Sequence, residues 1–313
     1  MRGMAHFTTD DIPDLTGRTV VVTGGNSGTG YETAKVLAGK GARVVIAARN
    51  ADKVAEARGR ILALHPGADV RFEPLDLSSQ ASVQGFADRW LEGGEAIDIL
   101  INNAGVMALE QRQETVDGFE MQLATNYLGH FGLTGRLLPV LRESRARVVQ
   151  LASIVHRQGA IRLDDLQYAT GYKAWPVYAQ SKLAMLMFAL ELDRRSRANG
   201  WGLTSVAAHP GYARTSLIEN GPMAGNALAR WGLRNVYRPF IEPLFSNSAA
   251  DGALPILLAA TQPVEGGSYW GVTELKEMKG PPGRAEIAPQ AQDDVVAAAL
   301  WARSEQLTGV RFG

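Results

Sequence analysis

The chain has 313 residues, and its composition is that of a folded globular protein. Hydrophobic residues make up 46% of the sequence and charged residues 20%, which excludes a disordered chain and permits a large core. The 32 basic and 32 acidic side chains balance, so no overall charge favours nucleic acid or an anionic membrane as a partner. The sequence has no cysteine, which excludes disulfides and thiolate metal sites and favours a reducing compartment such as the cytoplasm.

Residues 1–16 are predicted to form a short N-terminal extension. They include Asp10, Asp11 and Asp14 and lack an apolar core region, so they are not a secretory signal. No later stretch reaches the roughly 18 uncharged apolar residues that a membrane span needs. We therefore expect residues 17–313 to form one domain, since α/β domains of this length often surround a single sheet.

Short β-branched runs alternate with longer helical patterns along most of the chain. The expected strands are 19–22, 43–48, 70–75, 97–101, 148–151 and 203–208. The expected helices include 31–38, 51–64 after the N-cap candidate Asn50, and a segment around 83–91. This rhythm predicts βαβ units around a parallel sheet that helices cover on both faces.

The first expected strand leads into a glycine-rich turn at 23–30 with the spacing G-x-x-x-G-x-G. Glycine allows positive φ and close backbone approach, so the amides at the start of the following helix can hold a pyrophosphate. Such a turn can also be no more than a tight turn, but its place after the first strand of a βαβ series favours cofactor binding. The candidate cofactor-binding residues here are Gly24, Asn26, Ser27, Gly28, Thr29 and Gly30.

The next candidates follow the second to fourth strands, where ligands of such sheets bind. Arg49 stands about 20 residues past the glycine turn, where an NAD enzyme carries an acid against the ribose 2′-hydroxyl. A guanidinium suits a 2′-phosphate, so Arg49 predicts NADP(H) in preference to NAD(H), unless it is only a solvated charge at a strand end. The remaining candidates, which are also normal turn residues, are Asp76 and Leu77 near the adenine and Asn103, Ala104 and Gly105 near the ribose.

Tyr178 and Lys182 are four residues apart in a segment, 177–192, that has a helical pattern, so their side chains project from the same face. A free tyrosine has a pKa of about 10, and a nearby cation stabilises the phenolate. Lys182 and an oxidised nicotinamide are therefore expected to lower the pKa of Tyr178, which makes it a general acid in reduction and a base in oxidation. The alternative is a surface tyrosine beside a lysine, which is common.

Two further polar residues fall near the same edge of the sheet. Ser153 follows the fifth strand, where its hydroxyl could hold a substrate oxygen or serve only as a turn residue. Asn126 could position a water, although an asparagine in a helix usually has a local structural role. The histidines His130, His156 and His209 share no metal-ligand spacing, so we expect structural roles for them and no metal site.

Together these residues resemble the short-chain dehydrogenase/reductase family. The matching motifs are T-G-x-x-x-G-x-G at 23–30, N-N-A-G at 102–105, Asn126, Ser153, Y-x-x-x-K at 178–182 and P-G-x-x-x-T at 210–215. They cover roughly residues 17–216. The resemblance implies a single doubly wound Rossmann-type α/β domain, a nicotinamide cofactor, and hydride transfer to or from a carbonyl or alcohol carbon of a small molecule. Thr29 departs from the pattern, which usually has an aliphatic residue at this position.

The resemblance also implies roles for the catalytic residues. Tyr178 is the acid/base, and Lys182 binds the nicotinamide ribose and lowers the pKa of the tyrosine. Ser153 orients the carbonyl, and Asn126 supports a water relay. No catalytic group of the pattern is missing from this sequence.

A narrower similarity is to the retinol dehydrogenase-like and protochlorophyllide reductase-like branch of the family. It is carried by N-Y-L-G-H-F at 126–131 and by the stretches 153–156, 209–215 and 300–310. The cofactor-binding set then includes Pro210, Gly211 and Thr215, of which Thr215 would meet the carboxamide. Members of the family are often dimers or tetramers, so a homo-oligomer is a further expectation.

The stretch between Thr215 and Ala249 has no strand pattern, and in this family it covers the substrate. It supports a helical substrate lid at about 212–248, which Pro239 and Pro243 should kink or split. The apolar helical stripe consists of Leu233, Val236, Tyr237, Phe240, Ile241, Leu244 and Phe245. An apolar lid suggests a lipophilic ketone, aldehyde or alcohol as substrate. The row Arg230, Arg234 and Arg238 leaves a subunit interface or peripheral membrane contact as alternatives.

Two other functions are compatible with parts of these motifs. An epimerase or dehydratase can use the same tyrosine and lysine with a retained cofactor, but it normally needs a larger C-terminal substrate region. A non-catalytic cofactor-sensing module should lack the Tyr178–Lys182 pair, which is intact here.

Overall fold

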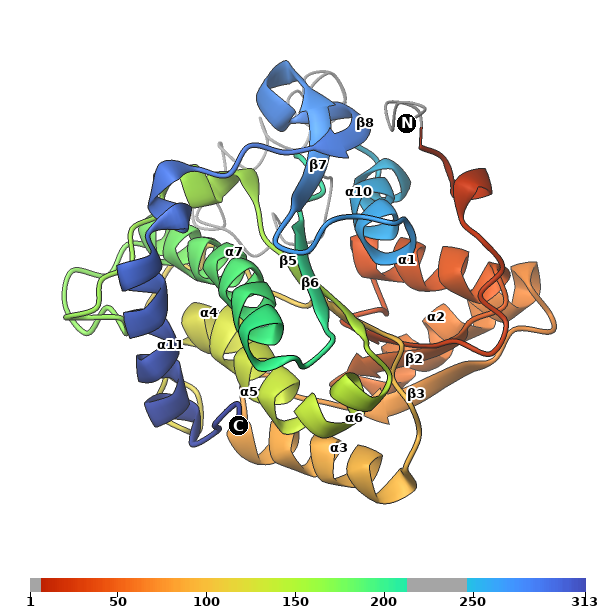
Figure 1. Ribbon diagram of the computed structural model, residues 1–313, viewed down its shortest axis with the longest axis horizontal. Helices are drawn as coiled ribbons and strands as arrows, with labels where there is room; N and C mark the ends of the chain where they lie inside the picture. Colours follow the sequence, from red (N-terminus) through yellow and green to blue (C-terminus); the bar gives the residue numbers. More distant parts are fainter. Residues whose placement is uncertain (1–6, 213–246) are drawn as a thin grey trace, which may run out of the picture.

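The computed structural model describes residues 7–212 and 247–313, and within these ranges one eight-stranded sheet lies between two layers of helices (Figure 1). In sheet order the strands are β3 (Val70–Pro74), β2 (Arg43–Ala48), β1 (Thr19–Thr23), β4 (Ile99–Asn102), β5 (Arg147–Leu151), β6 (Thr204–Ala208), β7 (Tyr269–Glu274) and β8 (Lys279–Arg284). Strands β1 to β7 are parallel, and β8 is antiparallel to β7.

The six strands expected from the β-branched runs are confirmed, with small shifts at their ends. The central strand β1 shows why the pattern is so clear. Val21 packs into one helix layer, while Val20 and Val22 pack into the other, and all three side chains are fully buried. A parallel strand covered on both faces needs apolar residues at every position, and a β-branched run satisfies this need.

The expected parallel sheet is confirmed through β7, and the last strand, β8, adds an antiparallel edge to it. Strand β8 contains Gly280, Pro281, Pro282 and Gly283, a composition that gives no strand signal. Proline lacks the N–H that an interior strand donates to its neighbours, so such a segment fits only at an edge. Strand β8 occupies that edge and pairs with β7 alone.

Helices cover both faces of the sheet (Figure 1). One layer contains α1 (Gly28–Gly39), α2 (Ala51–Leu64) and α10 (Ala249–Thr261). The other contains α3 (Gln80–Gly93), α4 (Met121–Leu123), the π-helical η3 (Ala124–Leu128), α5 (Gly129–Arg136), α6 (Leu138–Glu143), α7 (Ala174–Asn199) and α11 (Asp294–Thr308). Short 3₁₀ turns are η2 (Thr9–Asp11), η4 (Ile154–Gln158), η7 (Leu275–Glu277) and η8 (Pro289–Gln292). Asn50 caps α2 as expected, because its side chain accepts a hydrogen bond from the Lys53 amide.

The described part of the N-terminal segment packs on the domain. Phe7, Ile12 and Leu15 are buried in the core beneath α1 and α10. The Gln262 side chain donates a hydrogen bond to the Asp11 carbonyl at 3.0 Å. Most of the expected lid, with Thr215 and its apolar and arginine rows, lies outside the described residues. Of the helices that the structure describes, none combines the length and apolar character needed to cross a bilayer.

The carboxyl ends of the parallel strands meet at one edge of the sheet. The strand order runs outward in opposite directions from β1 and β4, which makes their junction the switch point of the fold. The loops after these strands bring the glycine turn, Asn103, Ser153 and Pro210 to this edge. Ligands bind at this position in open α/β sheets.

An aromatic cluster joins three elements of one helix layer. The Phe131 ring on α5 lies 5.2 Å from Phe188 on α7 and 5.1 Å from Trp301 on α11, measured between centroids. Phe312, in the C-terminal segment, lies 4.9 Å from Phe131 and 4.5 Å from Trp301. The cluster therefore ties the C-terminal helix to the helix that carries Tyr178.

We expect Phe131→Ala to lower the free energy of unfolding by about 3–5 kcal/mol, because it removes a fully buried ring and leaves a cavity among its neighbours. Urea denaturation measures the change. Val295→Ala on α11 is the control, since Val295 is 80% exposed and its loss should cost no more than about 0.5 kcal/mol. Equal losses in the two variants would show that the cluster does not hold the layer together.

Candidate active site

The turn between β1 and α1 needs glycine at several of its positions. Gly24 and Gly28 have positive φ values of 66° and 54°. A Cβ atom on Gly30 would overlap the Asn103 amide nitrogen and lie 2.6 Å from the Gly24 carbonyl oxygen. Ser27, the N-cap of α1, makes no side-chain capping bond, so the first amides of the helix are open to an anion. The turn therefore fits a dinucleotide pyrophosphate.

Hydrogen bonds join this turn to the loop after β4. The Thr23 hydroxyl oxygen accepts from the backbone amides of Asn103 and Ala104 at 2.8 and 2.9 Å. The Asn103 side chain donates to the Thr23 carbonyl at 2.8 Å and accepts from the Thr29 hydroxyl at 3.3 Å. Thr29, the departure from the family pattern, thus adds a polar link to the turn. The two predicted cofactor loops form one unit.

The structure places Arg49 and Asp76 together after β2 and β3. The Arg49 side chain is 62% exposed, and its Nη1 atom lies 3.9 Å from Asp76 Oδ1. The same carboxylate oxygen accepts from the amide and hydroxyl of Ser78, so it also shapes its own turn. Leu77 has a packing role, because its side chain is buried and its carbonyl leaves no space for a Cβ atom on Gly129.

The three predicted catalytic side chains from β5 and α7 come together. Tyr178 and Lys182 are only 7% and 5% exposed, and Ser153 hydrogen-bonds the Tyr178 side chain. The Lys182 ammonium donates to the Leu151 carbonyl at 2.8 Å and lies 6.0 Å from the centroid of the Tyr178 ring. The helix spacing and the end of β5 therefore produce the expected constellation.

Burial dominates the ionisation of this group. Desolvation raises the pKa of Tyr178 to about 12, and the hydrogen bond with Ser153 opposes the shift. Desolvation lowers the pKa of Lys182 to about 8. The expected lowering of the Tyr178 pKa by Lys182 is not seen in this structure, because the ammonium is bound to the Leu151 carbonyl and burial outweighs its charge. The protonated phenol is stable at neutral pH, which suits a proton donor.

Asn126 braces the loop after β4 against α7. Its amide nitrogen donates to the Val106 carbonyl and the Ser181 hydroxyl, both at 2.9 Å, and its Oδ1 atom accepts from the Val106 amide at 2.7 Å. A Cβ atom on Gly105 would lie 3.0 Å from this oxygen and 3.6 Å from Lys182 Nζ. Both side-chain protons of Asn126 are used by protein groups, so a water could only donate to its oxygen.

His130 connects Asn126 to the glycine turn. Its Nδ1 atom lies 2.9 Å from the Asn126 carbonyl, and its Nε2 atom lies 2.9 Å from the Thr23 hydroxyl. Burial lowers the pKa of His130 to about 3, so the ring is neutral and bridges a donor and an acceptor. Among the residues that the structure describes, no three His, Asp or Glu side chains are grouped to hold a metal ion.

The turn after β6 is also tightly enclosed. Gly211 has a φ of 69°, and a Cβ atom there would lie 2.6 Å from Asn247, Met278 and Val272 atoms. The Asn247 side chain donates to the Pro210 carbonyl at 3.0 Å. Pro210 and Gly211 therefore reach the same edge as the other candidates.

Trp175 was not anticipated as a site residue. Its ring meets the Tyr178 ring nearly edge-on, with centroids 6.0 Å apart and planes at 78°, while 49% of the residue is exposed. Ile154 and Val155, directly after Ser153, are also partly exposed. The sequence signal that could have identified Trp175 is its position three residues before Tyr178 in the same helix, which places the two side chains on one face. Trp175 therefore places a half-exposed apolar ring beside the ring of Tyr178.

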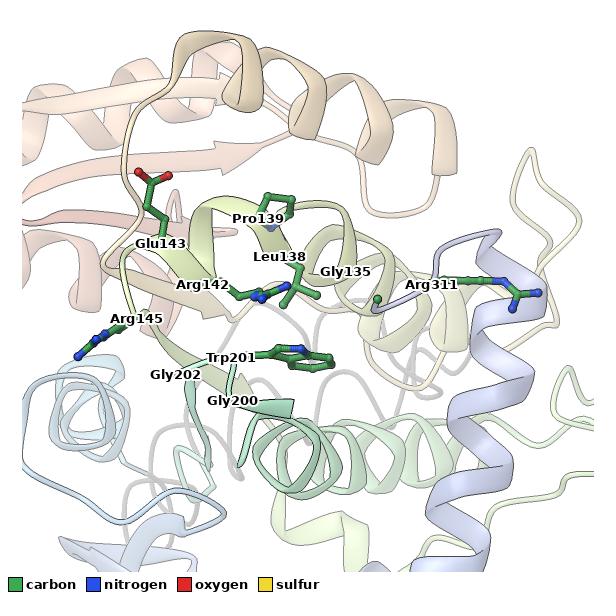
Figure 2. Close-up of a pocket in the computed structure, with 11 residues that line it drawn as sticks. Gly135, Leu138, Pro139, Arg142, Glu143, Arg145, Gly200, Trp201, Gly202 and Arg311 are labelled. Atoms are coloured by element: carbon green, nitrogen blue, oxygen red, sulfur yellow. The ribbon is translucent and has the colours of Figure 1, made fainter. Parts of the chain in front are cut away.

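A groove of about 930 Å³ lies elsewhere, beside α6, the residues before β6 and the C-terminal segment (Figure 2). Arg145 precedes β5 and Gly202 precedes β6, so the groove is at the amino end of the strands, opposite Ser153 and Tyr178. Figure 2 shows the side chains of Arg145 and Arg311 pointing apart rather than converging. The groove is therefore not the site of the chemistry.

The comparisons with known proteins agree with this site. The sequence model of short chain dehydrogenases matches residues 18–222. Polyprenol dehydrogenase from Mus musculus is 39% identical over 314 residues, covering 96% of this chain and 87% of the relative. Retinol dehydrogenase 13 from Homo sapiens is 38% identical over 302 residues, covering 95% and 86%.

Solved structures of similar proteins also resemble this chain over most of its length. An uncharacterized protein from Mycobacterium Paratuberculosis has a TM-score of 0.80 and 39% identity, covering 98% of this chain and 99% of that chain. A Pseudomonas aeruginosa RhlG/NADP active-site complex has a TM-score of 0.59 and 29% identity, covering 79% and 91%. With its glycine turn, its Ser153–Tyr178–Lys182 group and these relatives, the chain belongs to the short-chain dehydrogenase/reductase family of nicotinamide-dependent oxidoreductases.

Proposed function

We propose that this protein is an NADP(H)-dependent oxidoreductase that transfers a hydride between the nicotinamide and the carbonyl or alcohol carbon of a lipophilic ketone, aldehyde or alcohol. The observation that carries the proposal is the buried group of Ser153, Tyr178 and Lys182 beside a glycine turn that leaves helix amides open. Tyr178 acts as general acid in reduction and general base in oxidation.

The chain's own residues bind the substrate oxygen and move its proton. The bound nicotinamide supplies the hydride in reduction and accepts it in oxidation. The Ser153 hydroxyl holds the substrate oxygen next to the phenol, and Tyr178 gives its proton to that oxygen as the C=O bond becomes C–O–H. Lys182 keeps two N–H donors beyond its bond to the Leu151 carbonyl, and these suit the ribose hydroxyls. Its charge favours the phenolate as the proton leaves.

The cofactor preference rests on Arg49. The guanidinium is exposed at the carboxyl end of β2, and within residues 7–212 and 247–313 its ion-pair contact is the long one with Asp76, so it is available to a 2′-phosphate. Ala48 stands at the last position of the strand, where no acid is present to hold the ribose of NAD(H). The structural relative with NADP in its active site supports this preference.

The lipophilic substrate class rests on apolar side chains near Tyr178 and Ser153. Trp175 lies against the Tyr178 ring, and the partly exposed Ile154 and Val155 directly follow Ser153, whose hydroxyl would hold the reacting oxygen. The names of two similar proteins, polyprenol dehydrogenase and retinol dehydrogenase 13, refer to long apolar alcohols. We also propose that residues 212–248 form a helical lid over this apolar substrate.

We expect Tyr178→Phe to lower turnover by about 10² to 10⁴, because general acid–base catalysis contributes a factor of this size. NADPH absorbance measures turnover with a panel of carbonyls, and NADPH fluorescence measures binding, which should stay unchanged. Turnover close to that of the wild type would exclude Tyr178 as the acid. An epimerase would consume no net NADPH in the same assay, so the panel also separates the two enzyme functions.

Arg49→Asp should weaken the use of NADPH by about one to two decades, since a hydrogen bond to a charged group contributes roughly 1.5–3 kcal/mol. The use of NADH should stay level or improve, because the new carboxylate can accept from the ribose hydroxyls. The measurement is kcat/KM for both cofactors with one substrate. Arg303→Asp, the same charge reversal at an exposed position of α11, is the control. A wild type that prefers NADH, or equal loss of both cofactors, would contradict the role of Arg49.

Trp175→Ala should raise KM for a long apolar alcohol about tenfold, because burying a large apolar side chain contributes about 1.5–3 kcal/mol and half of this ring is already covered. A short alcohol that does not reach the indole should keep its kcat/KM. Leu64→Ala, an exposed apolar residue at the end of α2, is the control. Equal losses for the long and short alcohols would mean that Trp175 acts through Tyr178 rather than as a wall of the substrate site.

A further inference from the structure

A buried histidine follows β6 directly before the Pro210–Gly211 turn. The Nδ1 atom of His209 accepts a hydrogen bond from the Gly211 amide at 3.1 Å. Because this nitrogen is the acceptor, the proton of the neutral ring is on Nε2. That atom lies 3.3 Å from Glu277 Oε2. His209 therefore lies between the backbone of the turn and a carboxylate, which it faces at ion-pair distance without hydrogen-bond geometry.

The carboxylate of Glu277 lies close to polar groups from three separate segments of the chain. Besides His209, Arg157 Nη2 lies 2.9 Å from Oε2, and the Glu286 amide donates to Oε1 at 2.9 Å. The Glu277 side chain is only 14% exposed. A carboxylate in this position is stabilised only while these partners remain in place.

The backbone that carries Glu277 is strained. Leu275, Lys276 and Glu277 have successive φ values of 47°, 57° and 63°. Residues with a Cβ atom rarely adopt this left-handed region, because Cβ clashes with the backbone. Such a conformation persists where surrounding contacts hold it, and it is found most often at functional sites. The contacts of the Glu277 carboxylate are among those that join this backbone to the rest of the domain, together with the backbone bonds of Met278.

The network also reaches the loop that carries Ser153. Arg157 lies in η4, the 3₁₀ turn for which Ser153 is the N-cap. His156 in the same turn places its Nδ1 atom 2.6 Å from the Ser153 carbonyl. The Tyr269 ring lies between the two histidines, 5.4 Å from His156 and 5.1 Å from His209. One buried cluster thus contacts the segments after both β5 and β6.

A second set of bonds fixes the Pro210–Gly211 turn to the residue after Glu277. The Met278 carbonyl accepts from the Asn247 side chain at 3.1 Å and from the Tyr212 amide at 2.8 Å. The β7–β8 connection therefore holds the turn twice, through the Glu277 side chain and through the Met278 backbone.

We infer that His209, Glu277 and Arg157 are positioning residues, which hold the Pro210–Gly211 turn in its cofactor-binding conformation and fix it relative to Ser153. The inference deepens the proposed function and rests on it. None of the three would touch the reacting atoms. Removal of the carboxylate charge would take away the negative charge that faces the His209 ring and the Arg157 guanidinium, so the turn would lose this electrostatic support.

The test is a double-mutant cycle on NADPH affinity, measured as Kd by fluorescence titration of the full chain. Glu277→Gln keeps the side-chain shape and removes the charge, and His209→Asn keeps an acceptor near Gly211 but cannot reach Glu277. We expect each single variant to raise the Kd about tenfold, which equals about 1.4 kcal/mol. The double variant should also bind about tenfold more weakly, because both changes break the same link.

Glu286→Gln is the matched control. Its carboxylate contacts the same Arg157 at 3.3 Å but is 75% exposed, so its loss should change the Kd by less than about twofold. Circular dichroism and thermal melting establish that each variant is folded at the titration temperature. If His209→Asn does not fold, Arg157→Gln replaces it in the cycle with Glu277→Gln.

Folded variants that bind NADPH as tightly as the wild type would overturn the inference, even if they melt at a lower temperature, since the residues would then serve stability alone. A double variant about a hundredfold weaker than the wild type would also overturn it, because the two side chains would act independently. A wild type that binds neither NADPH nor NADH would instead refute the proposed function, and this inference with it.

Discussion

The Thr23 hydroxyl at the switch point is the interaction on which the site depends. It accepts from the amides of Asn103 and Ala104 and contacts His130 on α5, whose other ring nitrogen lies 2.9 Å from the Asn126 carbonyl in the π-helical segment η3. From η3, Asn126 continues the chain of hydrogen bonds to Ser181 on α7. The glycine turn and the helix that carries Tyr178 and Lys182 are thereby held in a fixed relation, although different strands place them.

Burial is the second constraint, because it sets the charge of the site. Tyr178 and Lys182 are both almost fully enclosed, and desolvation moves their pKa values toward the neutral forms. Burial raises the free energy of an isolated Tyr178 phenolate and of an isolated Lys182 ammonium. When both are present, their opposite charges attract each other and offset part of this cost. Burial therefore favours the neutral phenol over the phenolate in this structure.

The C-terminal part of the chain contacts the loops at the carboxyl edge of the sheet rather than merely extending the sheet. Strand β7 continues the parallel series next to β6, and β8 turns back along it as an edge strand rich in glycine and proline. Their strained connection directs Glu277 toward His209 and Arg157, which lie after β6 and β5. The aromatic cluster of Phe131, Trp301 and Phe312 anchors the terminal helix on the other side. Residues 247–313 therefore support the loops that follow β5 and β6.

The sequence alone determined what depends on neighbouring residues: the six β-branched strands, the glycine spacing at 23–30, and the helical spacing of Tyr178 and Lys182. Each of these signals has a short period or a fixed local geometry. The tertiary structure decided what depends on distant pairs. Thr23 and His130 are 107 residues apart, and nothing in either segment predicts their contact. The direction of the Tyr178 pKa shift likewise could not be predicted from the sequence, because it depends on how completely other elements bury the phenol. Strand β8 escaped detection since an edge position, and not its own composition, permits it to be a strand.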